Sequence, residues 1–518
     1  MTDQDLSHRS EQLHKFPGGL RLAENKEAST AQSIKTLPPP KKLILPLQQH
    51  AGVAPTLIVK PGQRVLKGEK LARADHDICV PIHAPTSGTI LEISEHLVPH
   101  PSGLTDTCII LEPDGKDESC EWQKIEDYRS TEPEILREHV REAGIVGLGG
   151  AVFPTYIKLN ATGHGPIECL ILNGAECEPY ISCDDMLMRE RAAEILEGAR
   201  IMLYALQTNH CVIAVEDNKP EAQAALQAEL DRLKDKRLEL VPVPSIYPEG
   251  GEKQLIQVLT GKEVPHDGLP VDIGLVCHNT GTAAAIYRAV VEGEPLIRRI
   301  VTVTGAGVKE PRNLEVLLGT PFSELIAACG GYAEDAARLI MGGPMMGVSV
   351  KDDSVPVIKA TNCVLAASAA EIQIQKDPMP CIRCADCAQA CPASLLPQQL
   401  YWHIRAQDLS KTQDYNLFDC IECGCCDYVC PSHIPLVSYF RFAKTEIWAQ
   451  EREREKADHA RDRFTLREQR ITEEKQAQAE RHRKKTAALN QTAKKTEIQA
   501  AVDRVKAKKT GHKTDDEE

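Results

Sequence analysis

The stretch that organises this chain reads Cys381-Ile-Arg-Cys384-Ala-Asp-Cys387-Ala-Gln-Ala-Cys391-Pro392 and resumes as Cys420-Ile-Glu-Cys423-Gly-Cys425-Cys426-Asp-Tyr-Val-Cys430-Pro431. Each half has the spacing C-x2-C-x2-C-x3-C-P, and 28 residues separate Cys391 from Cys420. Three thiolates at this spacing can surround one metal cube, while the fourth, held by a proline-stiffened turn, reaches across to another. The stretch therefore predicts two neighbouring clusters.

Bacterial ferredoxins hold [4Fe-4S] clusters with this spacing. Each predicted quartet takes three cysteines from one half of the stretch and the last cysteine of the other. The first quartet is Cys381, Cys384, Cys387 and Cys430, and the second is Cys391, Cys420, Cys423 and Cys426. Cys425 fits neither quartet and is interpreted as a spare thiol.

A pair of zinc sites is the alternative interpretation, because paired C-x2-C units also form tetrahedral sulfur sites. Zinc ribbons use two such pairs per metal, however, and have no need of a third cysteine in phase followed by x3-C-P. The iron-sulfur interpretation is therefore favoured, and it implies that electrons pass through this chain one at a time.

Length and composition indicate a chain of several domains with an aliphatic core. The 518 residues correspond to about three or four domains, and only 4% of them are aromatic. Eight of the 19 cysteines belong to the two quartets, and the rest are scattered. The N-terminal segment is polar with no apolar core of a signal peptide, so we expect reduced thiols in the cytosol. No apolar run is long enough to span a membrane.

The formal net charge of -14 is unevenly placed. From Arg441 to the end, 21 basic residues stand against 16 acidic ones. The rest of the chain is therefore strongly acidic, which argues against nucleic acid as a partner.

The N-terminal part of the sequence changes character after a polar arm that ends at Pro38-Pro39-Pro40. Residues 43–111 carry short β-rich runs separated by Pro-Gly, Lys-Gly and Ser-Gly turns, the pattern of a small antiparallel sandwich or barrel. The phrases at 59–68 and 83–91 resemble lipoyl-like barrel-sandwich domains. No lysine occupies the expected hairpin tip, where Asp75-His76-Asp77 stands, so we expect a docking role rather than a carrier role.

Strands and helices alternate in the next region. The sequence predicts a helix from Pro133 that stops at Gly144, strands over 168–173, 211–216 and 238–243, and helices over 189–206 and 220–236. This order predicts a parallel sheet covered by helices, with ligands at the carboxyl ends of the strands. The glycine-rich loop at 144–154 and the segment after Asn173 belong to that edge.

Four segments in this region resemble the NADH-oxidising flavoprotein subunit of respiratory complex I. They are Gly147-Leu-Gly-Gly-Ala-Val-Phe-Pro-Thr-Tyr-Ile-Lys158, Asn173-Gly-Ala-Glu176-Cys-Glu178-Pro179, Tyr247-Pro-Glu-Gly-Gly-Glu252 and His278-Asn279-Thr-Gly-Thr282. The chain departs from that family at Leu148 (usually Arg), Val152 (Gly), Ala175 (Asp), Gly251 (Glu) and Gly281 (Glu). These replacements are compatible with FMN binding. The family's nicotinamide contacts, however, cannot all be carried over to this chain.

The resemblance implies a role for each matched residue. Against FMN or its phosphate it places Gly147, Gly149, Gly150 and Lys158. The flavin would also be bonded by Asn173, Asn279 and Thr282. The nicotinamide side would be lined by Glu176, Glu178, Tyr247 and Glu252, with the two glutamates nearest the hydride transfer. Each also has an ordinary structural interpretation: Asn173 as a turn cap, Tyr247 as a core residue, and Glu176, Glu178 and Glu252 as solvated carboxylates.

The rest of the chain completes a multidomain α/β architecture. Residues 300–347 resemble the small β-grasp module of the same family, and beyond Trp448 a charged segment predicts a solvated helix or a disordered tail, with a basic contact to anionic lipid or to a partner as the alternative. The predicted divisions are an arm (1–40), a barrel-sandwich domain (41–115), an FMN/NADH α/β domain (130–295), a β-grasp, SLBB-like module (296–350), an α-helical two-cluster ferredoxin-like domain (366–445) and a tail (446–518).

This domain order resembles the RnfC family, the peripheral subunit of the Rnf (Rsx) ion-translocating electron-transport complex, over about residues 14–445. The resemblance implies electron transfer between NAD(H), FMN and two [4Fe-4S] clusters on the cytoplasmic face of the bacterial inner membrane. It also implies membrane-embedded and peripheral Rnf subunits as partners, together with a ferredoxin-like or other redox partner. Either direction of electron flow is compatible with these parts.

Two other classes remain open from the sequence. A soluble reductase of the cobalamin-reductase type has a similar flavin and two-cluster layout and would act alone on a corrinoid. A wiring subunit that has lost flavin is the other, since Leu148, Ala175 and Gly251 replace polar family residues.

Overall fold

A computed structural model describes residues 13–160, 165–372 and 377–510 of the chain. The chain divides into two units, residues 1–441 and 442–518, which are described separately. The first 12 residues of the predicted arm and the last eight of the predicted tail lie outside the described residues. None of the described helices combines the length and apolar character needed to cross a bilayer.

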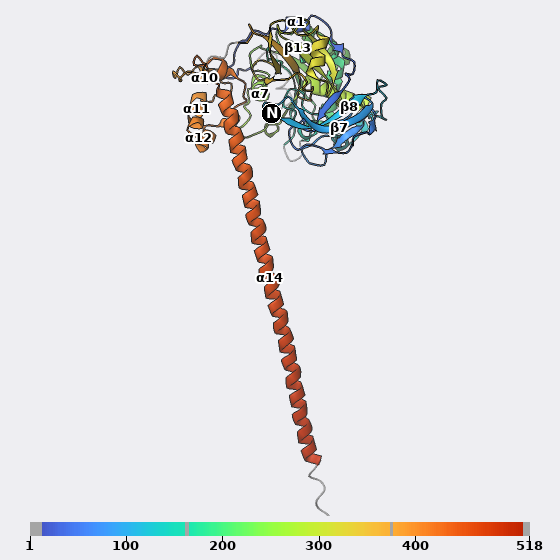
Figure 1. Cartoon of the computed structure of the whole chain (residues 1–518), viewed down its shortest axis with the longest axis vertical. Helices are drawn as coiled ribbons and strands as arrows, with labels where there is room; N and C mark the ends of the chain where they lie inside the picture. The colour runs from blue at the N-terminus through green and yellow to red at the C-terminus, as the bar shows by residue number, and fades with distance from the viewer. Residues whose placement is uncertain (1–12, 161–164, 373–376, 511–518) are drawn as a thin grey trace, which may run out of the picture. The chain divides into compact units, whose positions relative to one another are not determined.

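Two small antiparallel sheets follow the arm and confirm the predicted barrel-sandwich. The first has the order β2-β8-β7-β4, and the second has the order β3-β5-β6. The longest strands of the two sheets, β7 and β8, pair as one antiparallel hairpin (Figure 1). The strands are β2 (Leu43–Pro46), β3 (Thr56–Leu57), β4 (Arg64–Val65), β5 (Lys70–Arg73), β6 (Ile82–His83), β7 (Gly88–Leu97) and β8 (Thr105–Pro113).

A four-stranded, wholly parallel sheet of order β11-β10-β9-β12 forms the centre of the predicted flavin domain. Three of its strands match the predicted ones to within a residue, and all four carry apolar side chains on both faces, as expected for a sheet covered by helices on each side. The strands are β9 (Cys169–Gly174), β10 (Cys211–Glu216), β11 (Leu238–Val243) and β12 (Leu275–Asn279).

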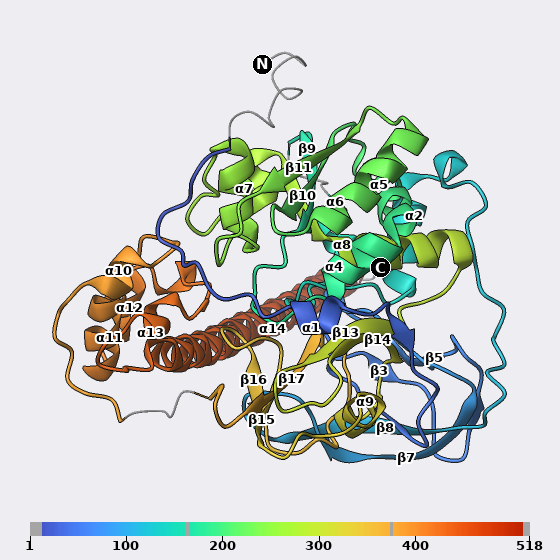
Figure 2. The same ribbon diagram turned by 90° about the horizontal axis from the view of Figure 1, so that it is seen from above.

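Helices cover both faces of this sheet (Figure 2). Helix α7 packs on one face, where Leu255 and Ile256 contact strand residues such as Ile171 and Val212. Helices α5, α6 and α8 lie on the other face and share the main core with Leu170 and Ile213. The helices of this region are α2 (Pro133–Glu142), α3 (Thr155–Lys158), α4 (Cys183–Glu190), α5 (Ala192–Leu206), α6 (Pro220–Leu233), α7 (Glu252–Thr260) and α8 (Thr280–Tyr287).

The prediction of one helix over 189–206 is wrong at its start. The structure has two helices, α4 and α5, which meet at Arg191, where the backbone leaves the helical region (φ -135°, ψ 37°). The Arg191 guanidinium pairs with Glu315 at 2.7 Å, a partner on a distant strand that no local pattern reveals. The break lets α4 begin close to the carboxyl ends of the strands.

A six-stranded mixed sheet of order β1-β14-β13-β17-β15-β16 follows. Strand β1 of the N-terminal arm pairs with β14, and β17, which lies beyond residue 350, pairs with β13 and β15. The sheet therefore recruits residues from outside the predicted 296–350 module. Its strands are β1 (Lys35–Thr36), β13 (Arg298–Thr304), β14 (Arg312–Leu317), β15 (Ala336–Met341), β16 (Val348–Val350) and β17 (Cys363–Ser368), and helix α9 (Phe322–Ala328) connects β14 to β15.

The two cysteine motifs fold as repeats of one another. Left-handed residues occur at matching positions, Arg383 and Ala385 in the first motif and Glu422 and Gly424 in the second. A single helical turn follows in each, α10 (Asp386–Gln389) and α13 (Cys425–Tyr428), and between the motifs lie α11 (Pro397–Arg405) and α12 (Leu409–Asp414). Helices α11 and α12 lie in the part of the chain predicted to be α-helical, 366–445. The repeated backbone explains why the same cysteine spacing occurs twice.

Helix α14 runs from Leu436 to Thr510 and makes up the described part of the second unit. Its side chains beyond residue 450 are almost all exposed, and close ion pairs along it include Lys456 with Glu453 and Lys484 with Glu480. Such pairs three or four residues apart stabilise a solvated helix. Of the two structures predicted for this segment, the described residues adopt the helical one.

Candidate redox site

The carboxyl edge of the parallel sheet gathers the four segments singled out in the sequence. Asn173 near the end of β9 and Asn279 at the end of β12 are directly paired across the sheet. Helices α7 and α8 begin at that edge, at Glu252 and Thr280. Helix N-termini and strand ends at one edge form the usual ligand crevice of an open α/β sheet.

The glycine-rich loop lies beside this edge. The Leu148 N–H donates to Thr282 Oγ1 at 2.9 Å, and a side chain at Gly149 would lie 3.4 Å from Asn279 Cβ. Gly149 and Gly150 are exposed, and Gly150 has a φ of +110° with open space where a side chain would project. The loop therefore presents bare backbone to solvent next to Asn279, which fits the approach of a flavin ring or phosphate.

The two asparagines hold neighbouring loops in place. Asn173 Nδ2 donates to the Gly250 carbonyl at 2.8 Å, and Asn173 Oδ1 accepts from the Ala175 N–H at 3.0 Å. Asn279 caps α8 by accepting from the Gly281 N–H at 2.8 Å, and its Nδ2 donates to Asp184 Oδ2 at 2.6 Å. Asn279 thus caps α8, and both asparagine side chains lie at the candidate site.

Lys158 and Glu252 form an ion pair with Nζ and Oε2 2.5 Å apart. Their side chains are 27% and 38% exposed, so the pair remains accessible from solvent. The resemblance assigned Lys158 to FMN or its phosphate and Glu252 to the nicotinamide side, and in the structure the two side chains contact each other.

Glu176 and Glu178 have structural partners. Glu176 is buried, and its carboxylate accepts from the Asp184 N–H at 2.9 Å and the Asp185 N–H at 3.3 Å, so it caps α4. Glu178 accepts from the N–H groups of Met345 and Met346 at 2.7 and 3.0 Å, and burial raises the pKa of its carboxyl. Both carboxylates thus hold backbone turns rather than standing free at the sheet edge.

Tyr247 connects the flavin segments to the cysteine motifs. Its side chain is buried, and its hydroxyl donates to the Cys423 carbonyl at 2.6 Å. Burial raises the pKa of Tyr247 well above its usual range, so the hydroxyl keeps its proton. Around it lies an apolar cluster that includes Cys423, Cys425 and Met345.

Two cavities in the cysteine region each gather one predicted quartet. Each cavity is lined by its four cysteines together with prolines and mostly apolar side chains, and the first also has Arg383, Gln398 and Ser432. The first has Cys381, Cys384, Cys387 and Cys430, and the second has Cys391, Cys420, Cys423 and Cys426. Four converging thiols in a mostly apolar pocket are a donor set that suits an iron-sulfur cube. Cys425 also lines the second cavity, and a hydrogen bond with the Cys423 thiol, together with burial, raises the pKa of the Cys425 thiol.

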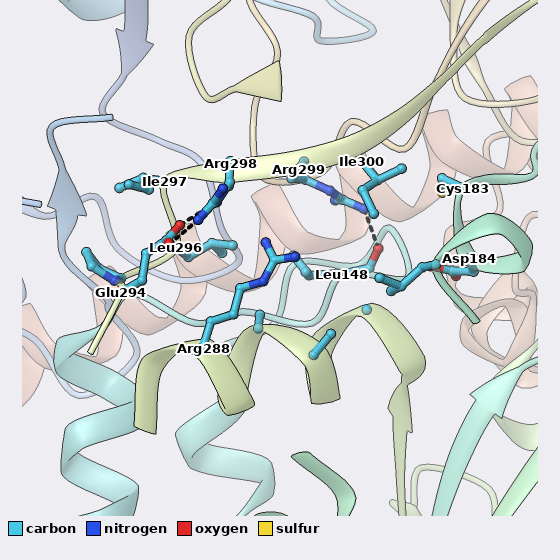
Figure 3. Close-up of a pocket in the computed structure, with 15 residues that line it drawn as sticks. Leu148, Cys183, Asp184, Arg288, Glu294, Leu296, Ile297, Arg298, Arg299 and Ile300 are labelled. Carbon is cyan, nitrogen blue, oxygen red and sulfur yellow. Dashed lines mark hydrogen bonds and ion pairs between the residues drawn. The ribbon is translucent and has the colours of Figure 1, made fainter. Parts of the chain in front are cut away.

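Three further residues were missed by the sequence reasoning. Burial, reinforced by the charge of Glu176, raises the pKa of Asp184 to about 7. Glu249 is fully buried, and within the described ranges neither of its carboxylate oxygens has a hydrogen-bond partner. Arg299 is buried and contacts the glycine-rich loop from its inner side, through the Leu148 carbonyl (Figure 3). In the sequence, Arg299 stands out only as part of the pair Arg298-Arg299, which lies between Ile297 and Ile300.

Comparison with known protein families agrees with this order of parts. The chain matches the RnfC barrel sandwich hybrid domain over 14–116, the Nuo51 FMN-binding domain over 140–288, the SLBB domain over 300–349 and the 4Fe-4S dicluster domain over 373–431. The chain is therefore a multidomain α/β protein with barrel-sandwich, FMN-binding, SLBB and 4Fe-4S domains.

Curated relatives that are named as one subunit of the ion-translocating oxidoreductase complex match most of the chain. The relative from Erwinia tasmaniensis is 46% identical over 92% of this chain and 58% of its own length. The relatives from Pseudomonas aeruginosa and Pectobacterium atrosepticum are 47% and 45% identical, over 90% and 97% of this chain and 60% and 72% of their own lengths. This chain thus spans about three fifths of the first two relatives.

A solved NAD+-reducing [NiFe]-hydrogenase in the H2-reduced state is a remote structural neighbour, with a TM-score of 0.44 and 20% identity over 57% of this chain and 59% of that one. A likeness this weak adds nothing to the assignment. The curated relatives and the four domain matches decide it, and the chain belongs to the RnfC family of ion-translocating oxidoreductase complex subunits.

Proposed function

We propose that this chain is the peripheral electron-entry subunit of a membrane-bound ion-translocating oxidoreductase, on the cytoplasmic face of the bacterial inner membrane. It passes electrons between NAD(H), FMN and two [4Fe-4S] clusters. The observation that carries the proposal is the hydrogen bond from Tyr247 to the Cys423 carbonyl, because it joins a flavin segment to a cluster motif.

FMN, when bound, supplies the conversion between a two-electron hydride and single electrons. The residues that would hold it are the exposed backbone of Gly149 and Gly150, the Lys158 ammonium, and the edge formed by Asn173 and Asn279. The glycine backbone offers hydrogen-bond donors, and the lysine offers a positive charge to a phosphate. Thr282 and Gly147 act indirectly, since each bonds within the loop or to it.

Each cysteine quartet would hold one [4Fe-4S] cluster. The quartet that contains Cys423 lies against Tyr247 and is the one nearer to the flavin segments. In the other quartet Cys384 is exposed, which makes that side accessible to a redox partner. Other subunits of the complex, membrane-embedded and peripheral, and a ferredoxin-like or other redox protein are the proposed partners.

The test is anaerobic reconstitution of the full chain, followed by flavin and iron analysis and an NADH titration read at the flavin and cluster absorbance bands. About one FMN and about eight iron per chain are expected for two [4Fe-4S] clusters. NADH should bleach the flavin and then the clusters. Eight iron without flavin, and with no response to NADH, would contradict the proposal and favour a wiring subunit. Activity of the isolated chain with a corrinoid acceptor would favour the soluble reductase.

A further inference from the structure

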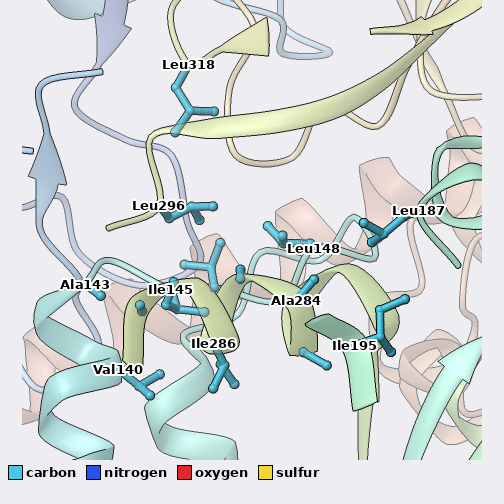
Figure 4. Close-up of a cluster of buried hydrophobic side chains, with 14 of the residues drawn as sticks. Val140, Ala143, Ile145, Leu148, Leu187, Ile195, Ala284, Ile286, Leu296 and Leu318 are labelled. Carbon is cyan, nitrogen blue, oxygen red and sulfur yellow. The ribbon is translucent and has the colours of Figure 1, made fainter. Parts of the chain in front are cut away.

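Leu148, in the middle of the glycine-rich loop, is anchored in three directions. Its N–H donates to Thr282 Oγ1 at 2.9 Å, and its carbonyl accepts from Arg299 Nη2 at 2.9 Å. Its side chain is buried in the core beside Leu187 and Ala284 (Figure 4). The loop is otherwise rich in glycine, so these anchors decide how its peptide groups are turned.

Arg299 is a charged residue in a buried position beside the glycine-rich loop. It is only 6% exposed, and its guanidinium donates to two backbone carbonyls, those of Leu148 and Lys359 (Figure 3). Within residues 13–160, 165–372 and 377–510, no carboxylate lies at ion-pair distance from it. The neighbouring Arg298, in contrast, pairs with Glu294 and Glu315.

A buried cation without a contacting carboxylate is costly, and here its hydrogen bonds serve the loop. Burial lowers the pKa of Arg299, but an arginine stays protonated at neutral pH. The positive charge therefore remains beneath the loop and favours an anion above it.

Because the peptide group is planar, the hydrogen bond from Arg299 to the Leu148 carbonyl also fixes the direction of the Gly149 N–H. The bond from Leu148 to Gly149 is trans, so its C=O and N–H point in opposite directions. With the Leu148 carbonyl held inward by Arg299, the Gly149 N–H is directed away from the guanidinium. Gly149 is exposed, and in the described part of the chain neither its N–H nor that of Gly150 donates to any protein acceptor.

We propose that Arg299 is the positioning residue that holds the Leu148–Gly149 peptide with its N–H presented to FMN. Because glycine has no side chain to restrict its backbone, this peptide could turn over once its carbonyl is released. A turned peptide would present a carbonyl oxygen to an electron-rich ligand and repel it. This inference rests on the proposed FMN site.

The experiment measures FMN binding to the reconstituted full chain by quenching of FMN fluorescence. Arg299→Gln should weaken binding by roughly ten- to a hundredfold, the range for losing one hydrogen bond to a charged group. Arg299→Lys keeps the charge and a donating nitrogen, but not the fork that reaches both carbonyls, and should restore part of the affinity. Thr282→Val, which releases the Leu148 N–H, should also weaken binding.

Arg298→Gln is the matched control, because it removes a neighbouring charge that lines the same cavity and does not contact the loop. It should lower the melting temperature yet leave the FMN dissociation constant within about twofold, inside ordinary surface-mutation effects. Equal affinities for wild type, Arg299→Gln and Arg299→Lys would overturn the inference while leaving the FMN site standing. No FMN binding by the wild-type chain would overturn the proposed function, and this inference with it.

Discussion

The hydroxyl of Tyr247 donates to the carbonyl of Cys423 across 176 residues of sequence, with 2.6 Å between the two oxygens. Tyr247 belongs to the third flavin-like segment and Cys423 to the second cysteine motif. The two predicted redox centres therefore share one packed contact rather than being joined only by a linker.

Tyr247→Phe keeps the ring and removes this hydrogen bond. Because the carbonyl is then left in a buried environment, we expect a loss of about 1–3 kcal/mol in the free energy of unfolding. Urea denaturation of the anaerobic, reconstituted chain measures it, with iron content unchanged. A variant as stable as the wild type would show that the contact contributes nothing to holding the domains together.

Cys430→Ala tests the crossed assignment of the quartets. It should remove the cluster of Cys381, Cys384 and Cys387, leave about four iron per chain, and spare the cluster beside Tyr247. Electron paramagnetic resonance distinguishes the two signals. Cys425→Ser is the control and should retain about eight iron, since Cys425 lies outside both quartets. Loss of the second cluster's signal in Cys430→Ala would contradict the assignment.

Lys158 and Glu252 form an ion pair, and we expect substitutions of the two residues to change FMN affinity in opposite directions. Lys158→Met removes a cation near the loop and should weaken FMN binding. Glu252→Gln frees that cation for the phosphate and should strengthen FMN binding by a few-fold, as for a partly exposed ion pair of about 1 kcal/mol. Fluorescence titrations at low and high salt measure both effects. Weaker binding in both variants would show that the ligand needs the intact pair.

The buried carboxyl of Glu249 should make the stability of the fold depend on pH. Burial, with a contribution from the charge of Asp217, raises the pKa of its carboxyl from 4.5 to about 8. The unfolded chain releases this proton at lower pH than the folded chain, so stability falls as the pH rises from about 4.5 to about 8. Glu249→Gln should remove this loss, on the order of 5 kcal/mol at pH 9. Denaturation at pH 5 to 9 measures it, and a mutant-to-wild-type difference that is the same at every pH would refute it.

Glu176→Gln separates the capping role from the predicted role at the nicotinamide. The buried carboxylate accepts two N–H groups at the start of α4, so we expect a loss of about 1–2 kcal/mol in stability, as for other helix caps. Thermal unfolding of the full chain measures it. Unchanged stability with a failure of NADH to reduce the flavin would instead assign Glu176 to the nicotinamide.

Much of the fold could be predicted because its signals are local. Turn residues and alternating apolar residues marked the barrel strands, and apolar runs marked β9, β10 and β11. The break at Arg191 was not predicted, because Arg191 pairs with Glu315, 124 residues away, and no local pattern reveals such a partner. Nor could the recruitment of β1 and β17 into the six-stranded sheet, since pairing between distant strands leaves no local pattern.

By itself, the sequence determined which atoms could act as cluster ligands and which loop lacks side chains, because thiol spacing and glycine placement are covalent facts of the chain. Only the tertiary structure decided which carboxylates are occupied in holding turns, which arginine lies beneath the loop, and which cysteine motif contacts the flavin segments. These depend on packing between elements far apart in sequence, where burial and a single hydrogen bond fix the position and charge state of a side chain.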